Sequence, residues 1–217
     1  MRRVSERAYL DRREAGRALA AAVLELPDLE DAVVLGLVRG GVPVAYEVAK
    51  AQGLPLDILV VRKLGAPGQE ELAMGAVASG GEVVFNEDVV RSFHVSPKFL
   101  EMLIEHEIES IARLEYLYRE GRAPVPIDGR AVILVDDGLA TGASMRAAIC
   151  AVKKRARSVV VAVPVGARST CEELATEVDR FVCTLTPERF DAVSLYYRDF
   201  EPTSDEEVRT LLRENRE

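Results

Sequence analysis

The residues best suited to chemistry lie between positions 132 and 144, which read Val-Ile-Leu-Val-Asp-Asp-Gly-Leu-Ala-Thr-Gly-Ala-Ser. Four apolar residues predict a buried strand, and the carboxylates of Asp136 and Asp137 stand where that strand ends. Small and hydroxyl-bearing residues then lead into a helix that begins near Met145. Unpaired N–H groups and the positive end of the helix dipole favour an anion there. The stretch therefore predicts two hydrogen-bond acceptors beside an anion-binding loop.

Two other predicted strand ends carry cations and glycines. The tripeptide Arg39-Gly40-Gly41 follows one apolar run, and the pair Arg62-Lys63 follows the next. Ligands of parallel α/β sheets bind beyond the carboxyl ends of the strands. The three strand ends together predict a ligand that is anionic at both ends and hydroxylated in the middle.

The elements that must position these residues alternate between apolar runs and helical patterns. This alternation predicts an α/β protein with a doubly wound parallel sheet of about five strands. The expected strands are 32–38, 56–61, 132–135, 158–164 and 181–185, and the expected helices are 5–24, 43–52, 97–120, 145–152, a short one capped by Ser169 and Glu172, and one from about Ser204. Residues 64–86 are rich in glycine and predict a mobile loop that carries a β-hairpin.

Composition excludes several classes of protein. The 217 residues are 48% hydrophobic and 29% charged, as expected for a single globular domain spanning 1–217. A net charge of −8 argues against nucleic acid or an anionic membrane as partner. No apolar run approaches the ~20 residues of a membrane span, so a cytoplasmic protein is expected. The three cysteines show no metal-ligand spacing and predict buried thiols, so we expect no metal site built from protein side chains.

The acidic pair could serve purposes other than an anion site. A strand followed by two aspartates also occurs in nucleotide hydrolases, but these need a Gly-x-x-x-x-Gly-Lys-Ser/Thr loop, which the chain lacks. A Gly-x-Gly-x-x-Gly motif after a strand is absent too, which argues against dinucleotide binding. The pair could also be a helix cap at a solvated edge, but the Thr-Gly-Ala-Ser segment behind it favours a binding site.

The 132–144 stretch resembles the phosphoribosyl pyrophosphate (PRPP) signature of type I phosphoribosyltransferases. Val38-Arg39-Gly40-Gly41 falls where that family has its pyrophosphate loop, and residues 62–67, Arg-Lys-Leu-Gly-Ala-Pro, are similar to the segment after the second strand of adenine-type members. The resemblance implies the type I phosphoribosyltransferase fold with a flap (64–86), an inserted long helix (97–120) and a small C-terminal hood (186–217).

The resemblance also implies a role for each motif. Asp136 and Asp137 would accept hydrogen bonds from the ribose hydroxyls and, with Arg62 and Lys63, would be the catalytic residues. The PRPP-binding set would comprise Arg39, Gly40, Gly41, Arg62, Lys63, Asp136, Asp137, Gly138, Ala140, Thr141, Gly142, Ala143 and Ser144. Mg²⁺ would be the cofactor, held mainly by PRPP and pyrophosphate oxygens and by water.

The acceptor is the least determined part of the prediction. Members that act on 6-oxopurines usually have an acid where this chain has Ala140, whereas adenine and uracil members tolerate Ala-Thr-Gly there. Arg168, Phe190 and Tyr197 are candidate base contacts, although the aromatic residues could instead be the packed underside of the hood.

Two functions follow from the resemblance. The first is Mg²⁺-dependent transfer of the 5-phosphoribosyl group from PRPP to a nitrogenous acceptor, with release of pyrophosphate. The second is a PRPP-binding sensor without turnover, which the cations of Arg39, Arg62 and Lys63 make the less favoured function. A homo-oligomer, a dimer, is expected, and helix 97–120 could cover the site or form the dimer surface.

Overall fold

The computed structural model describes residues 9–66, 68–93 and 95–216, with the backbone alone for 69–73. Residues 5–8 of the predicted N-terminal helix lie outside this range, as do the side chains of flap residues 69–73.

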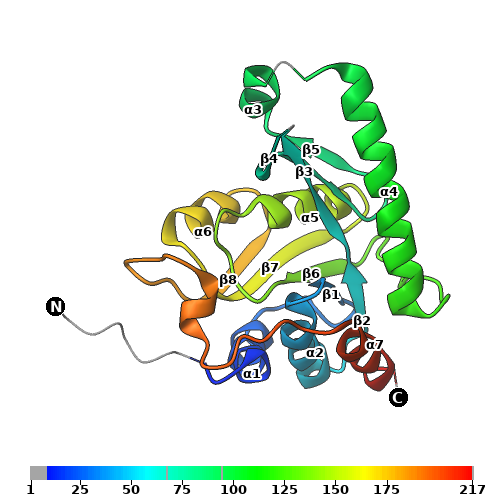
Figure 1. Cartoon of the computed structure of the whole chain (residues 1–217). Helices are drawn as coiled ribbons and strands as arrows, with labels where there is room; N and C mark the ends of the chain where they lie inside the picture. The colour runs from blue at the N-terminus through cyan, green and yellow to red at the C-terminus, as the bar shows by residue number, and fades with distance from the viewer. Residues whose placement is uncertain (1–8, 67, 94, 217) are drawn as a thin grey trace.

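Five parallel strands form the central sheet, in the order β2-β1-β6-β7-β8 (Figure 1). They are β1 (Val33–Leu37), β2 (Leu56–Leu59), β6 (Ala131–Val135), β7 (Ser158–Val165) and β8 (Arg180–Leu185). Each neighbouring pair is parallel, and every residue of β1, β2 and β6 is buried. The predicted five-stranded parallel sheet is confirmed, because a strand covered on both faces needs an unbroken apolar run.

Helices cover both faces of this sheet (Figure 1). Side chains of α1 (Arg12–Leu24), α2 (Gly41–Gln52) and α7 (Asp205–Glu214) pack in one core cluster with Val34 and Ile133. Those of α5 (Ala143–Lys153) and α6 (Arg168–Ala175) pack in another with Val33 and Leu134. Adjacent strand residues point to opposite faces, so the doubly wound arrangement follows from this division.

A second, antiparallel sheet holds the predicted flap. Its strands are β3 (Val61–Ala66), β4 (Gln69–Ala78) and β5 (Val83–Phe85), and α3 (Glu87–Ser92) follows. Only Val60 separates β2 from β3, so Arg62 and Lys63 lie inside β3. The predicted strand 56–61 was wrong at its end, because β2 stops at Leu59 and nothing in the continuous apolar run marks the change of sheet.

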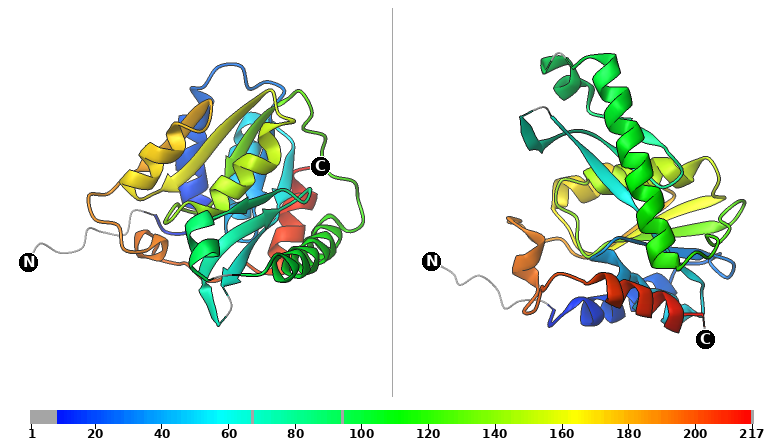
Figure 2. Two further views of the ribbon diagram at one scale, coloured as in Figure 1. Left: turned by 90° about the horizontal axis from the view of Figure 1, so that it is seen from above. Right: turned by 45° about the vertical axis from the view of Figure 1, so that its right-hand side comes forward.

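The long helix α4 (Pro97–Arg119) runs along β3 and β4 to the C-terminal helix α7 (Figure 2). It begins where the sequence predicted: the side chain of Ser96 accepts a hydrogen bond from the N–H of Phe99 at 3.3 Å. Its inner side, which includes Ile111 and Leu114, packs against the core that α1 and α2 share. Within the described residues, no helix is long and apolar enough to cross a membrane.

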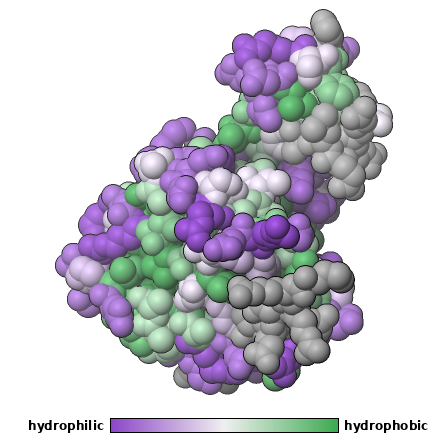
Figure 3. Space-filling model, turned by 90° about the vertical axis from the view of Figure 1, so that its left-hand side faces the viewer, coloured by the Kyte–Doolittle hydropathy of each residue, from purple (hydrophilic) through white to green (hydrophobic). Residues whose placement is uncertain are grey.

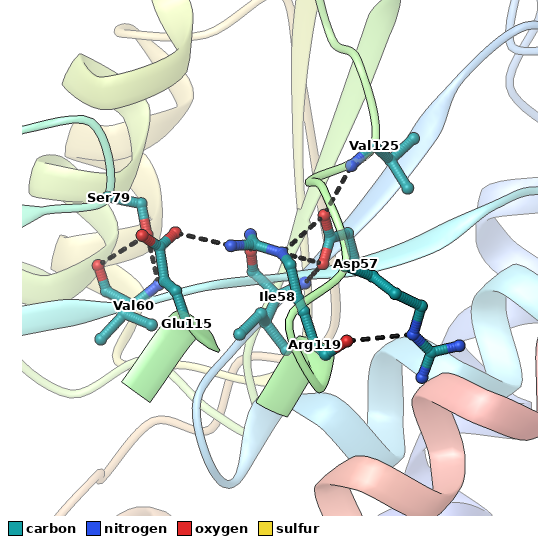
Figure 4. Close-up of polar contacts among 8 residues, drawn as sticks. Asp57, Ile58, Val60, Ser79, Glu115, Arg119 and Val125 are labelled. Atoms are coloured by element: carbon teal, nitrogen blue, oxygen red, sulfur yellow. Dashed lines mark hydrogen bonds and ion pairs between the residues drawn. The ribbon is translucent and has the colours of Figure 1, made fainter. Parts of the chain in front are cut away.

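A buried ion pair ties the end of α4 to β2 (Figure 4). Arg119 Nε lies 2.9 Å and 3.1 Å from the two carboxylate oxygens of Asp57, and the side chains are 7% and 1% exposed. The second oxygen also accepts from the N–H of Val125 at 2.8 Å. The remaining guanidinium nitrogens donate to Glu115 and to the carbonyl of Ile58. This network holds the C-terminal end of α4 against β2 of the main sheet.

Candidate functional site

The candidate site lies where the order in which the chain adds strands to the central sheet reverses. β1 and β6 are neighbours, but the chain leaves β1 toward β2 and leaves β6 toward β7 on the other side. Ligands bind at such a switch point in open α/β sheets. The loop 39–41 therefore stands directly beside Asp136 and Asp137, as the sequence predicted.

Glycine is required at positions 40 and 41 because the two loops touch. A Cβ on Gly41 would lie 2.6 Å from the carbonyl oxygen of Val135. One on Gly40 would lie 2.1 Å from Oδ2 of Asp137. A side chain at position 41 would push the two strand ends apart, and one at position 40 would displace the Asp137 carboxylate that Arg12 binds.

Asp136 is the more buried carboxylate of the pair. Its Oδ1 accepts a hydrogen bond from the N–H of Asp137 at 2.9 Å. Burial raises the pKa of Asp136 well above its usual range, and the charge of Asp137 raises it further.

Asp137 is paired with Arg12, a residue that sequence reasoning missed. Arg12 Nε lies 2.8 Å from Asp137 Oδ2, and the side chains are 11% and 15% exposed. Burial raises the pKa of Asp137 above its usual value, and the hydrogen bond and the charge of Arg12 offset only part of that rise. The two residues are 125 positions apart, and in the sequence Arg12 has only the pattern of a polar helix face.

The predicted anion-binding loop is held by the residues that follow β7. Leu139 donates from its N–H to the carbonyl of Val165, and Thr170 Oγ1 donates to the carbonyl of Ala140 at 2.8 Å. Gly142 adopts a φ of 77° at the start of α5, and among the described residues no side chain caps this helix start. The helix begins at Ala143 rather than near Met145. Its first N–H groups are therefore available to an anion.

The predicted cations do not all face this loop. Lys63 lines a cavity of about 580 Å³ together with Thr141, Ala143, Arg146 and Phe85. The cavity lies between the small sheet and the main body, where the surface in Figure 3 is hollowed. The structure thus brings Lys63 to the predicted phosphate loop.

Arg62 and Arg39 are instead paired with acids from two helices. Neighbouring residues of a strand point to opposite faces. Arg62 accordingly lies against α4, with its Nε 3.3 Å from Glu107 and its Nη2 donating to Ser110. Arg39 Nη1 lies 3.5 Å from Asp205 of α7. Neither arginine lines the cavity that Lys63 shares with the predicted phosphate loop.

The hood residues differ in what they can reach. Tyr197 is 1% exposed, and its ring packs beside Tyr9 and Phe200. Its hydroxyl donates to the carbonyl of Asp137 at 2.5 Å, and burial raises its pKa. Tyr197 is therefore a residue of the packed core. Because its ring is covered, we withdraw its predicted role as a base contact.

The other two predicted base contacts stay predictions. Phe190 is half-buried and stacks on Tyr196 with ring centroids 5.6 Å apart. Arg168 is exposed at the start of α6, and its Nη2 lies 3.4 Å from the carbonyl of Thr186.

Comparison with known proteins agrees with this geometry. The family model described as "Phosphoribosyl transferase domain" matches residues 7–198. A Mycobacterium tuberculosis protein named "Putative phosphoribosyl transferase" is 46% identical over 204 residues, which are 93% of this chain and 46% of that protein. The chain therefore spans about half the length of this curated relative. The crystal structure of TT1426 from Thermus thermophilus is 43% identical, with a TM-score of 0.79, and the match covers 95% of this chain and 98% of that one.

Proposed function

This chain belongs to the phosphoribosyl transferase domain family, and from that premise we propose that it transfers the 5-phosphoribosyl group from PRPP to a nitrogenous acceptor. Pyrophosphate is the other product. The observation that carries the proposal is the placement of the carboxylates Asp136 and Asp137 at the switch point, directly before the open start of α5, whose loop shares a cavity with Lys63. No single one of these features would suffice.

Each part of the site suits one part of PRPP. The 5-phosphate binds the first N–H groups of α5 and the hydroxyls of Thr141 and Ser144, where the dipole supplies about half a positive charge. The ribose hydroxyls donate to Asp136 and Asp137. The pyrophosphate lies toward the Gly40 and Gly41 loop, and we propose that Lys63 reaches it across the cavity that it lines with Thr141 and Ala143.

The chemistry follows from charge. As the bond between C1′ and the pyrophosphate oxygen breaks, positive charge grows on the ribose ring and negative charge on the leaving group. Lys63 stabilises the leaving group, and Asp137 lends negative potential to the ring. Arg39 and Arg62 join the leaving group only by leaving Asp205 and Glu107.

Magnesium fits this site as a metal brought by the substrate. Within the described residues, no cluster of three His, Cys, Asp or Glu side chains could hold a metal ion. Mg²⁺ commonly keeps its waters and relies on substrate phosphates, so PRPP oxygens and water would hold it. When bound, it neutralises charge on the pyrophosphate.

The acceptor remains a class rather than a compound. Ala140 has no acid for the proton of a 6-oxopurine, and its carbonyl already accepts the hydroxyl of Thr170. We propose an adenine-like or uracil-like acceptor on this ground. The second candidate function is a PRPP sensor without turnover, and the pairing of Arg39 and Arg62 with acids is the observation that favours it.

Calorimetry with PRPP and Mg²⁺ tests the binding site. Asp137→Asn should weaken PRPP binding by about 10- to 100-fold, because a hydrogen bond to a charged group contributes about 1.5–3 kcal/mol. Asparagine is preferred to alanine because it still accepts a hydrogen bond from Arg12. Asp128→Asn, an exposed aspartate paired with Arg155, is the control and should bind like wild type. Equal affinity of the two variants would contradict the site.

Release of pyrophosphate across a panel of bases and small amines separates the two functions. Release with any acceptor establishes an enzyme. PRPP binding without release across the whole panel establishes the sensor.

A further inference from the structure

We propose that Arg12 is a positioning residue that keeps the Asp137 carboxylate ionised and turned toward the ribose. The inference rests on the proposed function, because it concerns the carboxylate that would bind the ribose. It assigns a role in the site to the start of α1, which carries none of the sequence motifs.

Arg12 is held on three sides. Its Nε donates to Asp137 Oδ2 at 2.8 Å, and its Nη1 donates to the carbonyl of Glu201 at 2.7 Å. Its guanidinium carbon lies 3.8 Å from the centre of the Phe200 ring. An arginine fixed in this way has little rotamer freedom left to lose, so it can orient its partner at low entropic cost. Arg12 from α1 and residues 200–201 from the segment before α7 thus meet beside Asp137, and Figure 1 shows this segment passing α1.

The next residue shows that this placement is specific. Arg13 also forms an ion pair and also lies over an aromatic ring, but it does so away from the site, with Glu47 at 2.8 Å and the Tyr46 ring at 4.6 Å. Of these two arginines, only Arg12 binds a carboxylate of the candidate site. Arg13 is therefore a matched control.

Asp137 needs a cation because of where the fold puts it. It is buried beneath Gly40, and this burial opposes its ionisation. Of the other ionisable groups on the packed elements, Tyr197 meets the Asp137 carbonyl through its hydroxyl, and Arg39 is turned to Asp205. Arg12 is the group whose hydrogen bond and charge lower the pKa of Asp137.

The pairing also selects the oxygen that serves the ribose. Oδ2 of Asp137 is taken by Arg12 and lies against Gly40, so Oδ1 is the oxygen left for a ribose hydroxyl. An ionised carboxylate only accepts hydrogen bonds, which matches a hydroxyl donor. A protonated one would present a donor to another donor.

The test measures PRPP binding with Mg²⁺ from about pH 5 to pH 8 for wild type, Arg12→Met, Arg12→Lys and Arg13→Met, with folding checked by circular dichroism. Arg12→Met should weaken binding at neutral pH by 10-fold or more. It should also move the acid limb of the profile upward by about one pH unit or more, since an opposite charge within hydrogen-bond distance shifts a carboxyl pKa by about 1–3 units. Arg12→Lys should restore the acid limb, and Arg13→Met should leave both affinity and limb unchanged.

Two results would overturn the proposal. One is an Arg12→Met profile that matches wild type. The other is a uniform loss of affinity with the acid limb unmoved, which is what a merely structural role would give.

Failure of the proposed function would look different, because wild type would then not bind PRPP at any pH. Carbon-13 NMR titration of the Asp137 carboxyl, assigned with Asp137→Asn, decides the inference in that case. A higher Asp137 pKa in Arg12→Met supports it, and an unchanged value refutes it.

Discussion

Replacing Asp57 with asparagine perturbs the ion pair that joins α4 to β2. Asp57 is 1% exposed and accepts hydrogen bonds from Arg119 Nε and from the N–H groups of Ile58 and Val125. Asparagine keeps the shape but has only one oxygen. Whichever way its amide is turned, the new NH₂ group faces a donor, and the buried guanidinium of Arg119 loses its main counter-charge.

The cost can be estimated from the burial. Removing one partner of a buried ion pair typically destabilises a protein by about 3–5 kcal/mol. With a urea m-value of about 2–3 kcal/mol/M, the midpoint of unfolding should fall by about 1–2.5 M. Equilibrium urea unfolding followed by circular dichroism measures this directly.

Asp128→Asn is the control, because Asp128 also receives two hydrogen bonds from one arginine, at 2.9 Å and 2.7 Å, but at the surface. Its midpoint should stay close to wild type. The reasoning is refuted if the two variants shift the midpoint equally. In a double-mutant cycle, Asp57→Asn and Arg119→Met together should cost clearly less than the sum of the single changes.

Two further predictions concern the site. Burial raises the pKa of Asp136 in the folded state above its unfolded value of about 3.9. Between these two pKa values the folded state binds a proton that the unfolded state has lost, so the free energy of unfolding falls as the pH rises through this range. Asp136→Asn should therefore have a higher thermal midpoint than wild type at pH 8 and a similar one near pH 4; a variant less stable at pH 8 would show that the carboxylate is not destabilising. For the cations, Lys63→Met should lower PRPP affinity, measured by calorimetry, by more than Arg62→Met does, because Lys63 lines the cavity and Arg62 is engaged by Glu107. The opposite order would mean that Arg62 swings into the site when PRPP binds.

Local features of this chain were readable in the sequence because they depend on neighbouring residues. The run of four apolar residues before Asp136 requires a strand covered on both faces, and β6 is buried throughout. Ser96 and Ser204 cap the helices that follow them, each accepting from the N–H three residues on. The alternation of strands and helices was enough to predict the doubly wound sheet and to place the 39–41 loop beside the acids.

Where the chain switches sheets was not readable, because Val60 stands in an apolar run that suits either sheet. The strand alternation that sends Arg62 to α4 and Lys63 to the cavity could have been inferred once β3 was known to begin at Val61.

The sequence by itself determined the fold class and the position of the acidic pair, and it predicted the anion-binding loop, since these features depend on neighbouring residues. Only the tertiary structure decided what holds Asp137. Arg12 is 125 positions away in the chain, and Tyr197 is 60. Such pairs depend on how helices pack over a sheet, and no local spacing encodes that. The carboxylate predicted to bind the ribose is therefore recognisable from its motif, but its ionisation and orientation come from the packing of both ends of the chain around it.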